Sequence, residues 1–275
     1  MPEPHISVVV AVFNGAATLP ACIDSIVAQS FRDREIVVID GGSTDGTVEY
    51  LRGNASLFGS WVSEPDRGIY HAWNKALARA KGSWLAFLGA DDRFHDAGAL
   101  QELARAAQAT RHRIVYGRMD LIVRAGVVAQ TVGKPWAKSR GDFVSGFMFP
   151  HPGALHHRSL FAEHGNFDEA YRYAGDYEFL LRELITRDAE YVDRVIDDMA
   201  VRGMTARPET IHKVLLEVDR ARRAHGLAGP SLRLRRALAT SWLGARVHAL
   251  LGERAFNVLA DAYRVVRGRP RIWTA

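Results

Sequence analysis

The chain is short of cysteine and of long apolar runs. Its 275 residues include one cysteine, Cys22, which excludes an intrachain disulfide framework and a cysteine-rich zinc module and favours a reducing compartment. No stretch approaches the roughly 18 consecutive apolar residues of a membrane-spanning helix. Residues 1–5 carry neither a basic region nor a small-residue cleavage site. We therefore expect no secretory signal and a cytoplasmic location.

Several common catalytic signatures are also missing. The chain has no dinucleotide-binding glycine fingerprint, no phosphate loop ending in Gly-Lys-Ser/Thr, and no nucleophile-elbow serine. Oxidoreductase, ATPase and serine hydrolase functions therefore lose their best support. With 48% hydrophobic and 24% charged residues, the composition is that of a folded globular protein.

Positive charge is concentrated at the C-terminal end. Residues 211–275 hold thirteen Lys and Arg against four Asp and Glu, a net charge of +9, whereas the whole chain carries +5. An acidic body with a basic tail indicates a polyanionic partner, either lipid headgroups or nucleic acid. The tail has no known nucleic-acid motif, so we expect no nucleic-acid partner.

The first half of the chain alternates β-branched runs with amphipathic stretches. These patterns predict strands over residues 6–12, 35–40, 61–63 and 83–88, and helices over 19–27, 48–51, 69–81 and 97–109. Four such units predict an α/β fold with a Rossmann-like, mostly parallel central sheet flanked by helices. Ligands bind such sheets beyond the carboxyl ends of the strands. Polar side chains stand at those ends: Asn14, Asp40, Glu64 and Asp91.

The second half is more irregular. It predicts strands or hairpins over residues 114–132 with turns at Gly117 and Gly126, and a loop over 133–152. Helices are predicted over 158–164 and 177–186, and a strand over 190–196. Two or three amphipathic helices follow residue 208, interrupted at 226–230 and at Gly252. We expect one catalytic domain, 1–207, with halves 1–112 and 113–207, and a basic helical extension, 208–275.

The strand-end carboxylates suggest a ligand site. Asp40 precedes a glycine-rich turn and is suited to accept a hydrogen bond from a ring N–H of a bound base. Asp45 has a simpler interpretation as a cap of the helix that starts near Thr47. Asp91 and Asp92 are adjacent and repel each other, and Mg²⁺ or Mn²⁺ would relieve that repulsion. A solvated turn would explain the same pair.

Four sequence blocks share their order and spacing with a known family. Over about residues 5–200 the chain strongly resembles the family 2 glycosyltransferases, which have the GT-A fold, mostly invert the anomeric centre and use nucleotide-diphosphate sugars. The blocks are Val8-Val9-Val10-Ala11-Val12-Phe13-Asn14, Val38-Ile39-Asp40-Gly41-Gly42-Ser43-Thr44-Asp45-Gly46-Thr47, Glu64-Pro65-Asp66-Arg67-Gly68-Ile69-Tyr70 with Ala72-Trp73-Asn74-Lys75, and Phe87-Leu88-Gly89-Ala90-Asp91-Asp92.

The resemblance implies a donor site. Asp91 and Asp92 match the metal motif and imply Mn²⁺ or Mg²⁺, with Asp92 as the last carboxylate. The family usually has Asp where this chain has Gly89, which leaves the metal dependence and the third ligand open. By the same resemblance, Asp40 binds the base, most often uracil. The remaining donor contacts are the nucleotide-lining Ala11, Phe13 and Asn14 and the diphosphate contacts Arg67 and Lys75.

An acceptor-side block lies downstream. Phe167-Asp168-Glu169 and Ala174-Gly175-Asp176-Tyr177-Glu178-Phe179 resemble the segment that holds the general base, which makes Asp176 the expected base and Glu178 the second choice. A helix N-cap is the alternative role for Asp176. His151 is a candidate donor or acceptor contact, or a structural residue. An acceptor-stacking platform or core packing would each explain four aromatic residues: Trp136, Phe143, Phe147 and Phe149.

These observations predict transfer of a sugar, with inversion, from a donor such as a UDP-sugar to a saccharide or lipid-linked saccharide. The product would be a cell-surface polysaccharide or a glycolipid. A non-catalytic nucleotide-sugar-binding module of the same fold is the alternative, and Gly89 is its best support. The basic amphipathic segment 231–268 suggests peripheral attachment to an anionic membrane. Packing on the catalytic domain or a homodimer seam would also explain it.

Overall fold

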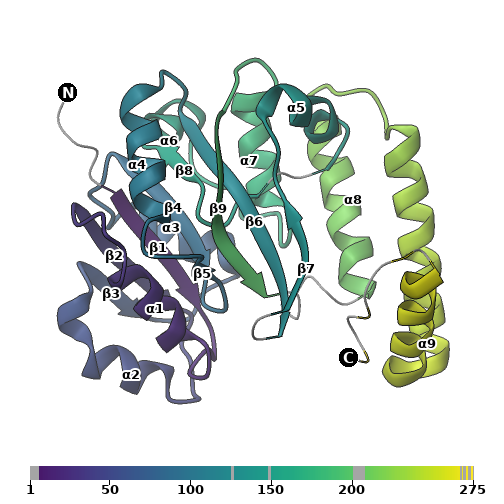
Figure 1. Cartoon of the computed structure of the whole chain (residues 1–275), viewed down its shortest axis with the longest axis horizontal. Coiled ribbons are helices and arrows are strands. Elements are labelled where there is room, and N and C mark those ends of the chain that lie inside the picture. Colours follow the sequence, from purple (N-terminus) through teal and green to yellow (C-terminus); the bar gives the residue numbers. More distant parts are fainter. Residues whose placement is uncertain are drawn as a thin grey trace.

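The computed structural model describes residues 6–124, 127–147, 150–200, 208–266, 268, 271 and 274. These residues form an α/β fold around a nine-stranded mixed sheet, with the C-terminal helices at one end (Figure 1). Its strands are β1 Ile6–Val12, β2 Arg34–Asp40, β3 Ser60–Ser63, β4 Trp84–Gly89, β5 Arg93–Phe94, β6 Ile114–Arg124, β7 Val127–Val132, β8 Leu155–His157 and β9 Glu190–Ala200. Its helices are α1 Leu19–Val27, α2 Thr47–Gly53, α3 Ile69–Leu77, α4 Ala99–Ala109, α5 Trp136–Val144, α6 Ser159–His164, α7 Gly175–Leu184, α8 Pro208–Ala224 and α9 Leu232–Val266.

The N-terminal half is a parallel sheet in the order β3-β2-β1-β4, as the four repeated units predict. The strands end in register: Val12 pairs with Asp40, Asp40 with Ser63, and Ala11 with Gly89. Because parallel strands share one carboxyl edge, the segments that follow β1, β2, β3 and β4 meet there. This alignment positions the candidate site.

The C-terminal half makes the sheet mixed. Strand β8 runs antiparallel to both β4 and β6, β6 and β9 are parallel, and β5 and β7 pair antiparallel at the margins. The prediction of a turn at Gly117 is wrong, because Gly117 lies inside β6. A Cβ there would lie 2.4 Å from Ile196 Cγ1, so close strand packing requires the glycine. Gly126 lies outside the described residues.

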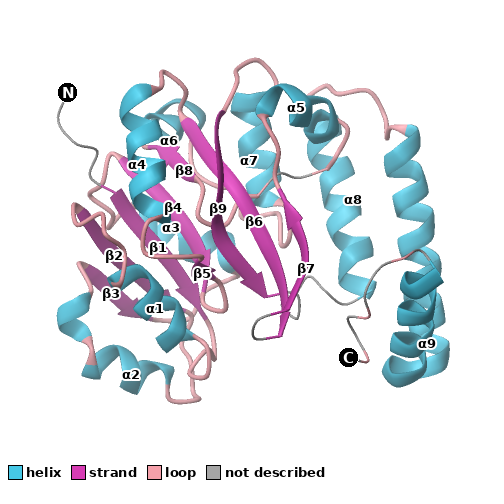
Figure 2. Cartoon of the chain, viewed as in Figure 1, coloured by secondary structure: helices cyan, strands magenta, loops and turns pink. Residues whose placement is uncertain are grey.

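Helices cover both faces of the sheet (Figure 2). One core cluster packs α1 and α4 onto β-strand residues such as Val8 and Val38. The other packs α3, α6 and α7 onto the opposite side chains, such as Val9 and Val37. Side chains alternate along each strand, so burial on both faces explains the continuous apolar runs.

Several predicted boundaries differ from the structure by one or two residues, and three predictions differ by more. Residues 133–152 are not all loop, because α5 forms there and buries Trp136, Ser139 and Phe143 at helical spacing. Helix α3 ends at Leu77 rather than at residue 81, and β9 continues to Ala200 rather than ending at residue 196. Pairing of β9 with β6 and β5 supports those extra residues, a long-range effect that local sequence does not reveal.

The C-terminal helices form as predicted, with a break in α9 at Gly252, where φ is +75°. Helix α8 packs on α7. Its Val218 and Ala221 belong to the same core cluster as α3 and α7, and so does Leu234 of α9. The division at residue 207 stays a prediction. Among the described residues, no helix is both long and apolar enough to cross a membrane.

Candidate active site

The loops after β1 and β2 are joined by hydrogen bonds. The Asn14 backbone N–H donates to Ser43 Oγ at 2.6 Å, and the Thr44 N–H donates to Asn14 Oδ1 at 2.9 Å. Asn14 has a φ of +50°, a conformation that Asn tolerates better than most residues. Asp45 accepts from Ala16 N–H and from the Thr47 N–H and hydroxyl, so it stabilises the start of α2, but the N-cap is Gly46 and not Asp45 as predicted. The two loops therefore form one rigid rim.

Asp40 is fully buried at the end of β2. One oxygen accepts from the N–H groups of Gly42 and Ser43, at 3.1 and 3.0 Å, and from the Ser63 hydroxyl at 2.6 Å. The other oxygen accepts from the Ser43 hydroxyl. The carboxylate therefore organises the glycine turn. Its role in base binding stays a prediction.

Gly41 lies between Asp66 and the candidate donor contact Phe13. A Cβ on Gly41 would lie 2.7 Å from Asp66 Oδ2 and 3.3 Å from the ring of Phe13, so both side chains pack on its backbone. Phe13 is exposed and available to a ligand, whereas Ala11 is partly buried within β1. The two predicted diphosphate contacts already have acidic partners: Arg67 pairs with Glu169 and Lys75 with Glu64. A bound diphosphate would compete with those carboxylates.

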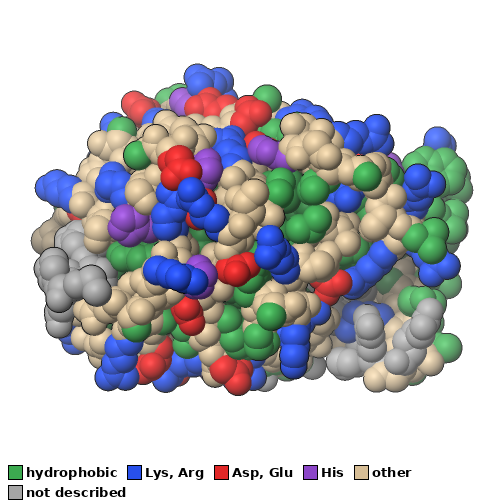
Figure 3. All heavy atoms as spheres, turned by 90° about the horizontal axis from the view of Figure 1, so that it is seen from above, with side chains coloured by type: hydrophobic (Ala, Val, Ile, Leu, Met, Phe, Trp, Pro, Cys, Tyr) green, Lys and Arg blue, Asp and Glu red, His purple; other side chains and the backbone are tan. Residues whose placement is uncertain are grey.

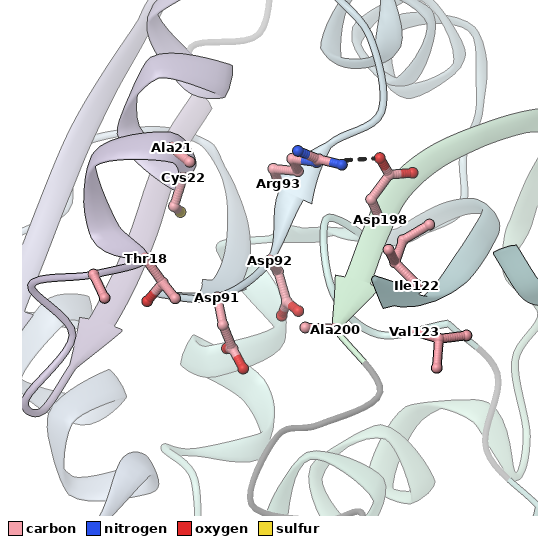
Figure 4. Close-up of a pocket in the computed structure, with 11 residues that line it drawn as sticks. Thr18, Ala21, Cys22, Asp91, Asp92, Arg93, Ile122, Val123, Asp198 and Ala200 are labelled. Atoms are coloured by element: carbon pink, nitrogen blue, oxygen red, sulfur yellow. Dashed lines mark hydrogen bonds and ion pairs between the residues drawn. The ribbon is translucent and has the colours of Figure 1, made fainter. Parts of the chain in front are cut away.

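Asp91 and Asp92 follow β4 and converge above Gly89. A Cβ at Gly89 would lie 2.8 Å from Asp92 Oδ2 and 2.9 Å from Asp91 Oδ1, and the Gly89 N–H donates to Asp92 Oδ2 at 3.1 Å. Burial, and then the charge of Asp91, raises the pKa of Asp92 to about 7. Both aspartates line a cavity of about 320 Å³, and Figure 4 shows them pointing away from the Arg93–Asp198 ion pair.

Asp176 lies in the first turn of α7, two residues after Ala174, which is the actual N-cap. The prediction that Asp176 caps the helix is therefore wrong. Its Oδ1 accepts a hydrogen bond from the Tyr70 hydroxyl at 3.1 Å, and burial raises its pKa to about 6. A Cβ on Gly175 would lie 2.8 to 2.9 Å from the Tyr70 ring, so the glycine permits this approach. A base with this pKa is ionised at neutral pH.

Glu217 of α8 binds the backbone at the N-terminal end of α7. Its carboxylate accepts from the backbone N–H groups of Arg172, Tyr173 and Ala174, at 2.8 to 3.1 Å. An anion at this position also interacts favourably with the positive end of the helix dipole. The α8 helix thereby fixes the segment that carries Asp176.

Two further candidate site residues, Glu178 and His151, contact other side chains of the protein. Glu178, the second choice of base, pairs with Arg182 and with His225, which directly follows α8. His151 is buried and stacks on Trp73 with centroids 5.3 Å apart, and burial lowers its pKa to about 4. It is therefore neutral at pH 7, and its contact with donor or acceptor stays a prediction.

The four aromatic residues do not form one platform. Trp136 and Phe143 are core residues, and Trp136 Nε1 donates to Asp188. Phe147 lies under the Arg233 guanidinium, 3.9 Å from ring centroid to Cζ, and Phe149 lies outside the described residues. Core packing explains the first two.

A second group of metal-ligand type lies nearby. His95, Asp120 and Asp198 bring ligand atoms within 4.8 Å of one another. Their carboxylates have protein partners, since Asp198 pairs with Arg93 and His95 while Asp120 accepts from the Thr131 hydroxyl. These contacts account for the cluster without a cation.

The comparisons with known proteins agree with this geometry. The model for glycosyl transferase family 2 matches residues 7–154, more than half of the chain. This chain belongs to glycosyl transferase family 2. A PGL/p-HBAD biosynthesis glycosyltransferase of Mycobacterium tuberculosis is 34% identical to this family 2 chain over 186 residues, which cover 66% of this chain and 70% of the relative.

Solved structures show the GT-A fold for this family 2 member. TarS residues 1–349 of S. aureus, in complex with UDP-GlcNAc, matches with a TM-score of 0.64 at 18% identity, covering 92% of this chain and 75% of TarS 1–349. The chain spans 43% of a longer TarS chain. A mannosyltransferase of Pyrobaculum calidifontis, in complex with GDP-Man and Mn²⁺, matches at 0.62 with 21% identity, covering 96% and 80%. The predicted fold class is confirmed.

Sequence reasoning missed several residues that shape the site. Asp66 and Tyr70 lie inside a recognised block but received no role. Glu217 carries no local signal, because only the packing of α8 on α7 places it at the helix entrance.

Proposed function

We propose that this family 2 glycosyltransferase transfers a sugar from a UDP-linked donor, with inversion and with a divalent cation, to a saccharide or lipid-linked saccharide. The observation that carries the proposal is the shared carboxyl edge, where Asp40 ends β2 and Asp91 and Asp92 follow β4, on either side of β1. Asp176 supports catalysis because it is a buried carboxylate held by Tyr70. The UDP-GlcNAc and GDP-Man complexes of proteins with this fold support a nucleotide-sugar donor.

The residues after β4 fit a cation. Asp91 Oδ1 and Asp92 Oδ2 converge on the space that a side chain at Gly89 would fill, and hard carboxylate oxygens are the ligands that Mg²⁺ and Mn²⁺ prefer. When bound, the cation would neutralise charge on the leaving diphosphate. Arg67 and Lys75 would add positive charge once they exchange Glu169 and Glu64 for phosphate.

Asp176 would act on the acceptor. Its carboxylate, held by the Tyr70 hydroxyl at Oδ1, would take the proton from an acceptor hydroxyl as that oxygen attacks the anomeric carbon. The new glycosidic bond forms on the face opposite the departing diphosphate, which gives inversion. The proton ends on Asp176, and the electron pair of the broken bond ends on the diphosphate.

We also propose a peripheral membrane location, with a glycolipid or a surface polysaccharide as the product. The M. tuberculosis relative is named for PGL/p-HBAD biosynthesis. Helix α9 contains six arginines against one Glu and one Asp. Figure 3 shows hydrophobic and basic side chains together at the α9 end of the molecule. The exposed apolar side chains of α9 are Leu232, Trp242, Leu243, Leu250, Leu251, Val258, Leu259, Tyr263, Val265 and Val266. Such a surface is typical of helices that lie in an anionic interface.

A screen of nucleotide sugars tests the proposal. Thermal unfolding is measured with UDP- and GDP-sugars, with Mn²⁺ and with EDTA, because a ligand specific to the native state raises the melting temperature. We expect the largest rise with a UDP-sugar and Mn²⁺, followed by UDP release when an acceptor is added. Donor binding with no transfer to any saccharide or lipid-linked acceptor would favour the non-catalytic module.

A further inference from the structure

Glu169 joins the acceptor-side segment to the donor half through two contacts. Its Oε2 pairs with the Arg67 guanidinium, and its Oε1 accepts a hydrogen bond from Asn74 Nδ2 at 3.0 Å. The pair is accessible, because the Arg67 side chain is 71% exposed and the Glu169 side chain is 31% exposed. Hydrogen bonds from Asn74 and, to a lesser extent, from Arg67 lower the pKa of Glu169, so its carboxylate stays ionised at neutral pH.

Asn74 holds this segment in place without the help of Arg67. Its Nδ2 also donates to the Phe167 carbonyl at 3.0 Å, and its Oδ1 accepts from the Phe167 N–H at 3.0 Å. Asn74 stands four residues after Tyr70 on the same face of α3, and the Tyr70 hydroxyl holds Asp176. The segment from Phe167 to Asp176 is therefore fastened to α3 near both of its ends, one helical turn apart.

Arg67 has two competing anionic partners in the donor complex. In the proposed function Arg67 contacts the donor diphosphate, which carries more negative charge than one carboxylate. An exposed ion pair is weak, worth a factor of roughly 1 to 5 in an equilibrium constant, so the diphosphate can displace Glu169 at small cost. The exchange takes the Arg67 partner from Glu169 Oε2, while Asn74 keeps Oε1 and the side chain in place.

We propose that Glu169 is a binding residue for the acceptor saccharide and that it takes this role when the donor diphosphate takes over Arg67. The inference rests on the proposed function, because it assumes that Arg67 contacts the diphosphate. In the empty protein Arg67 occupies Oε2, and in the donor complex Oε2 accepts a hydrogen bond from a saccharide hydroxyl. The saccharide would then bind best after the nucleotide, oriented by a carboxylate on the same segment as Asp176.

Calorimetry of UDP binding to the full chain, in Mn²⁺, tests the exchange. Glu169→Gln removes the competitor for Arg67, so UDP should bind roughly 2- to 5-fold more tightly than to the parent. Glu49→Gln, which removes one charge from an exposed position of α2, should leave the UDP affinity unchanged. Arg67→Ala should weaken UDP binding, and Glu169→Gln should bring no gain in that background, because the competition needs both side chains.

Saturation-transfer NMR tests the acceptor role, with the methyl glycosides of glucose, galactose and mannose as probes. In the parent, a glycoside should bind more tightly with UDP and Mn²⁺ than without UDP. Glu169→Gln should weaken the binding seen with UDP roughly 10-fold, because a hydrogen bond to a charged group is lost, and Glu49→Gln should retain it. A structural role of Glu169 alone would weaken UDP binding as well, which is opposite to the gain expected by calorimetry.

The outcomes separate this inference from the proposed function. UDP binding that is unchanged or weaker in Glu169→Gln overturns the exchange, and so does equal UDP affinity of Arg67→Ala and the parent. Glycosides that bind the parent and Glu169→Gln equally, or that bind neither in the presence of UDP, overturn the acceptor role of Glu169. Failure of the parent to bind UDP, with or without Mn²⁺, overturns the donor site of the proposed function itself.

Discussion

The Tyr70 hydroxyl donates a hydrogen bond to Oδ1 of Asp176 across 3.1 Å, between α3 of the donor half and α7 of the acceptor half. Opposing effects set the proton affinity of this carboxyl group. Burial disfavours the charged form and raises its pKa to about 6, while hydrogen bonds from the Tyr177 backbone N–H and from the Tyr70 hydroxyl favour the charged form. A base tuned in this way is ionised at pH 7 yet retains enough basicity to accept a proton.

Tyr70→Phe should move the acid limb of the kcat/KM profile to higher pH. As the proposed base, Asp176 can accept a proton only when it is deprotonated, so activity should fall as the pH drops through about 6 in the parent. Removing the hydroxyl takes a hydrogen bond from the charged form and raises the pKa of Asp176 further. Tyr50→Phe, on α2, is the control and should leave the profile in place. A Tyr70→Phe limb that coincides with the parent limb would argue against Asp176 as the base.

Asp176→Asn should bind the donor normally and transfer poorly. The amide keeps the shape of the carboxyl group but cannot accept the acceptor proton, so kcat should fall by a factor of roughly 10² to 10⁴. Calorimetry of UDP binding and a transfer assay measure the two effects separately. Turnover near that of the parent would move the role of base to another group, and Glu178→Gln would be tested next.

Asp92→Ala should weaken UDP binding in Mn²⁺ far more than in EDTA. The Asp92 carboxylate lies beside Asp91 at the end of β4, where it would hold the cation between protein and diphosphate. Calorimetric titration of UDP in the two buffers gives the comparison. If the parent protein binds UDP equally in Mn²⁺ and in EDTA, the cation is not part of the donor site.

The donor half could be predicted from sequence because its signals are local. Buried apolar runs defined β1, β2 and β4, and the residues at their ends lie where the parallel sheet requires. The acceptor half was harder. Gly117 looks like a turn glycine, but its packing against Ile196 decides its conformation, and these residues are far apart in the chain. Local patterns hold no information about such a contact.

The site shows the same division. The sequence singles out Asp40 and Asp176 by position. It does not reveal the hydrogen bonds that the Ser63 hydroxyl donates to Asp40 and the Tyr70 hydroxyl donates to Asp176. Burial also decides which residues are engaged: His151 is enclosed beneath the aromatic stack with Trp73, and Glu178 is paired with Arg182. Such partners come from elements that meet only in the folded chain.

Glu217→Gln should destabilise the entrance to α7. The carboxylate accepts backbone N–H groups of residues 172–174, so losing its charge should lower the free energy of unfolding by about 1–2 kcal/mol. The negative charge of Glu217 also raises the pKa of Asp176. The acid limb of kcat/KM should therefore move to lower pH, opposite to Tyr70→Phe. Urea unfolding measures the first effect and pH–rate profiles measure the second, with Glu253→Gln at an exposed position as the control. If the acid limbs of Glu217→Gln and Tyr70→Phe moved in the same direction, the result would contradict this account.

The exposed apolar side chains of α9 should attach the protein to anionic vesicles. The triple variant Leu243→Ser, Leu250→Ser and Val258→Ser removes apolar contacts but keeps all six arginines, and each arginine near an anionic surface contributes about 1 kcal/mol. In co-sedimentation at low salt, the parent should pellet with phosphatidylglycerol vesicles but not with phosphatidylcholine vesicles. High salt should release it, and the triple variant should pellet less.

Leu216→Ser, an equally exposed position of α8, is the matched control and should pellet like the parent. Light scattering distinguishes the alternative use of this surface, because an apolar seam between two copies would double the mass in solution. A parent protein that is dimeric and stays in the supernatant with anionic vesicles, together with a monomeric triple variant, would assign α9 to self-association. In that case a membrane would not be required to explain the arginines, because the rim of a dimer interface is polar and accessible to solvent.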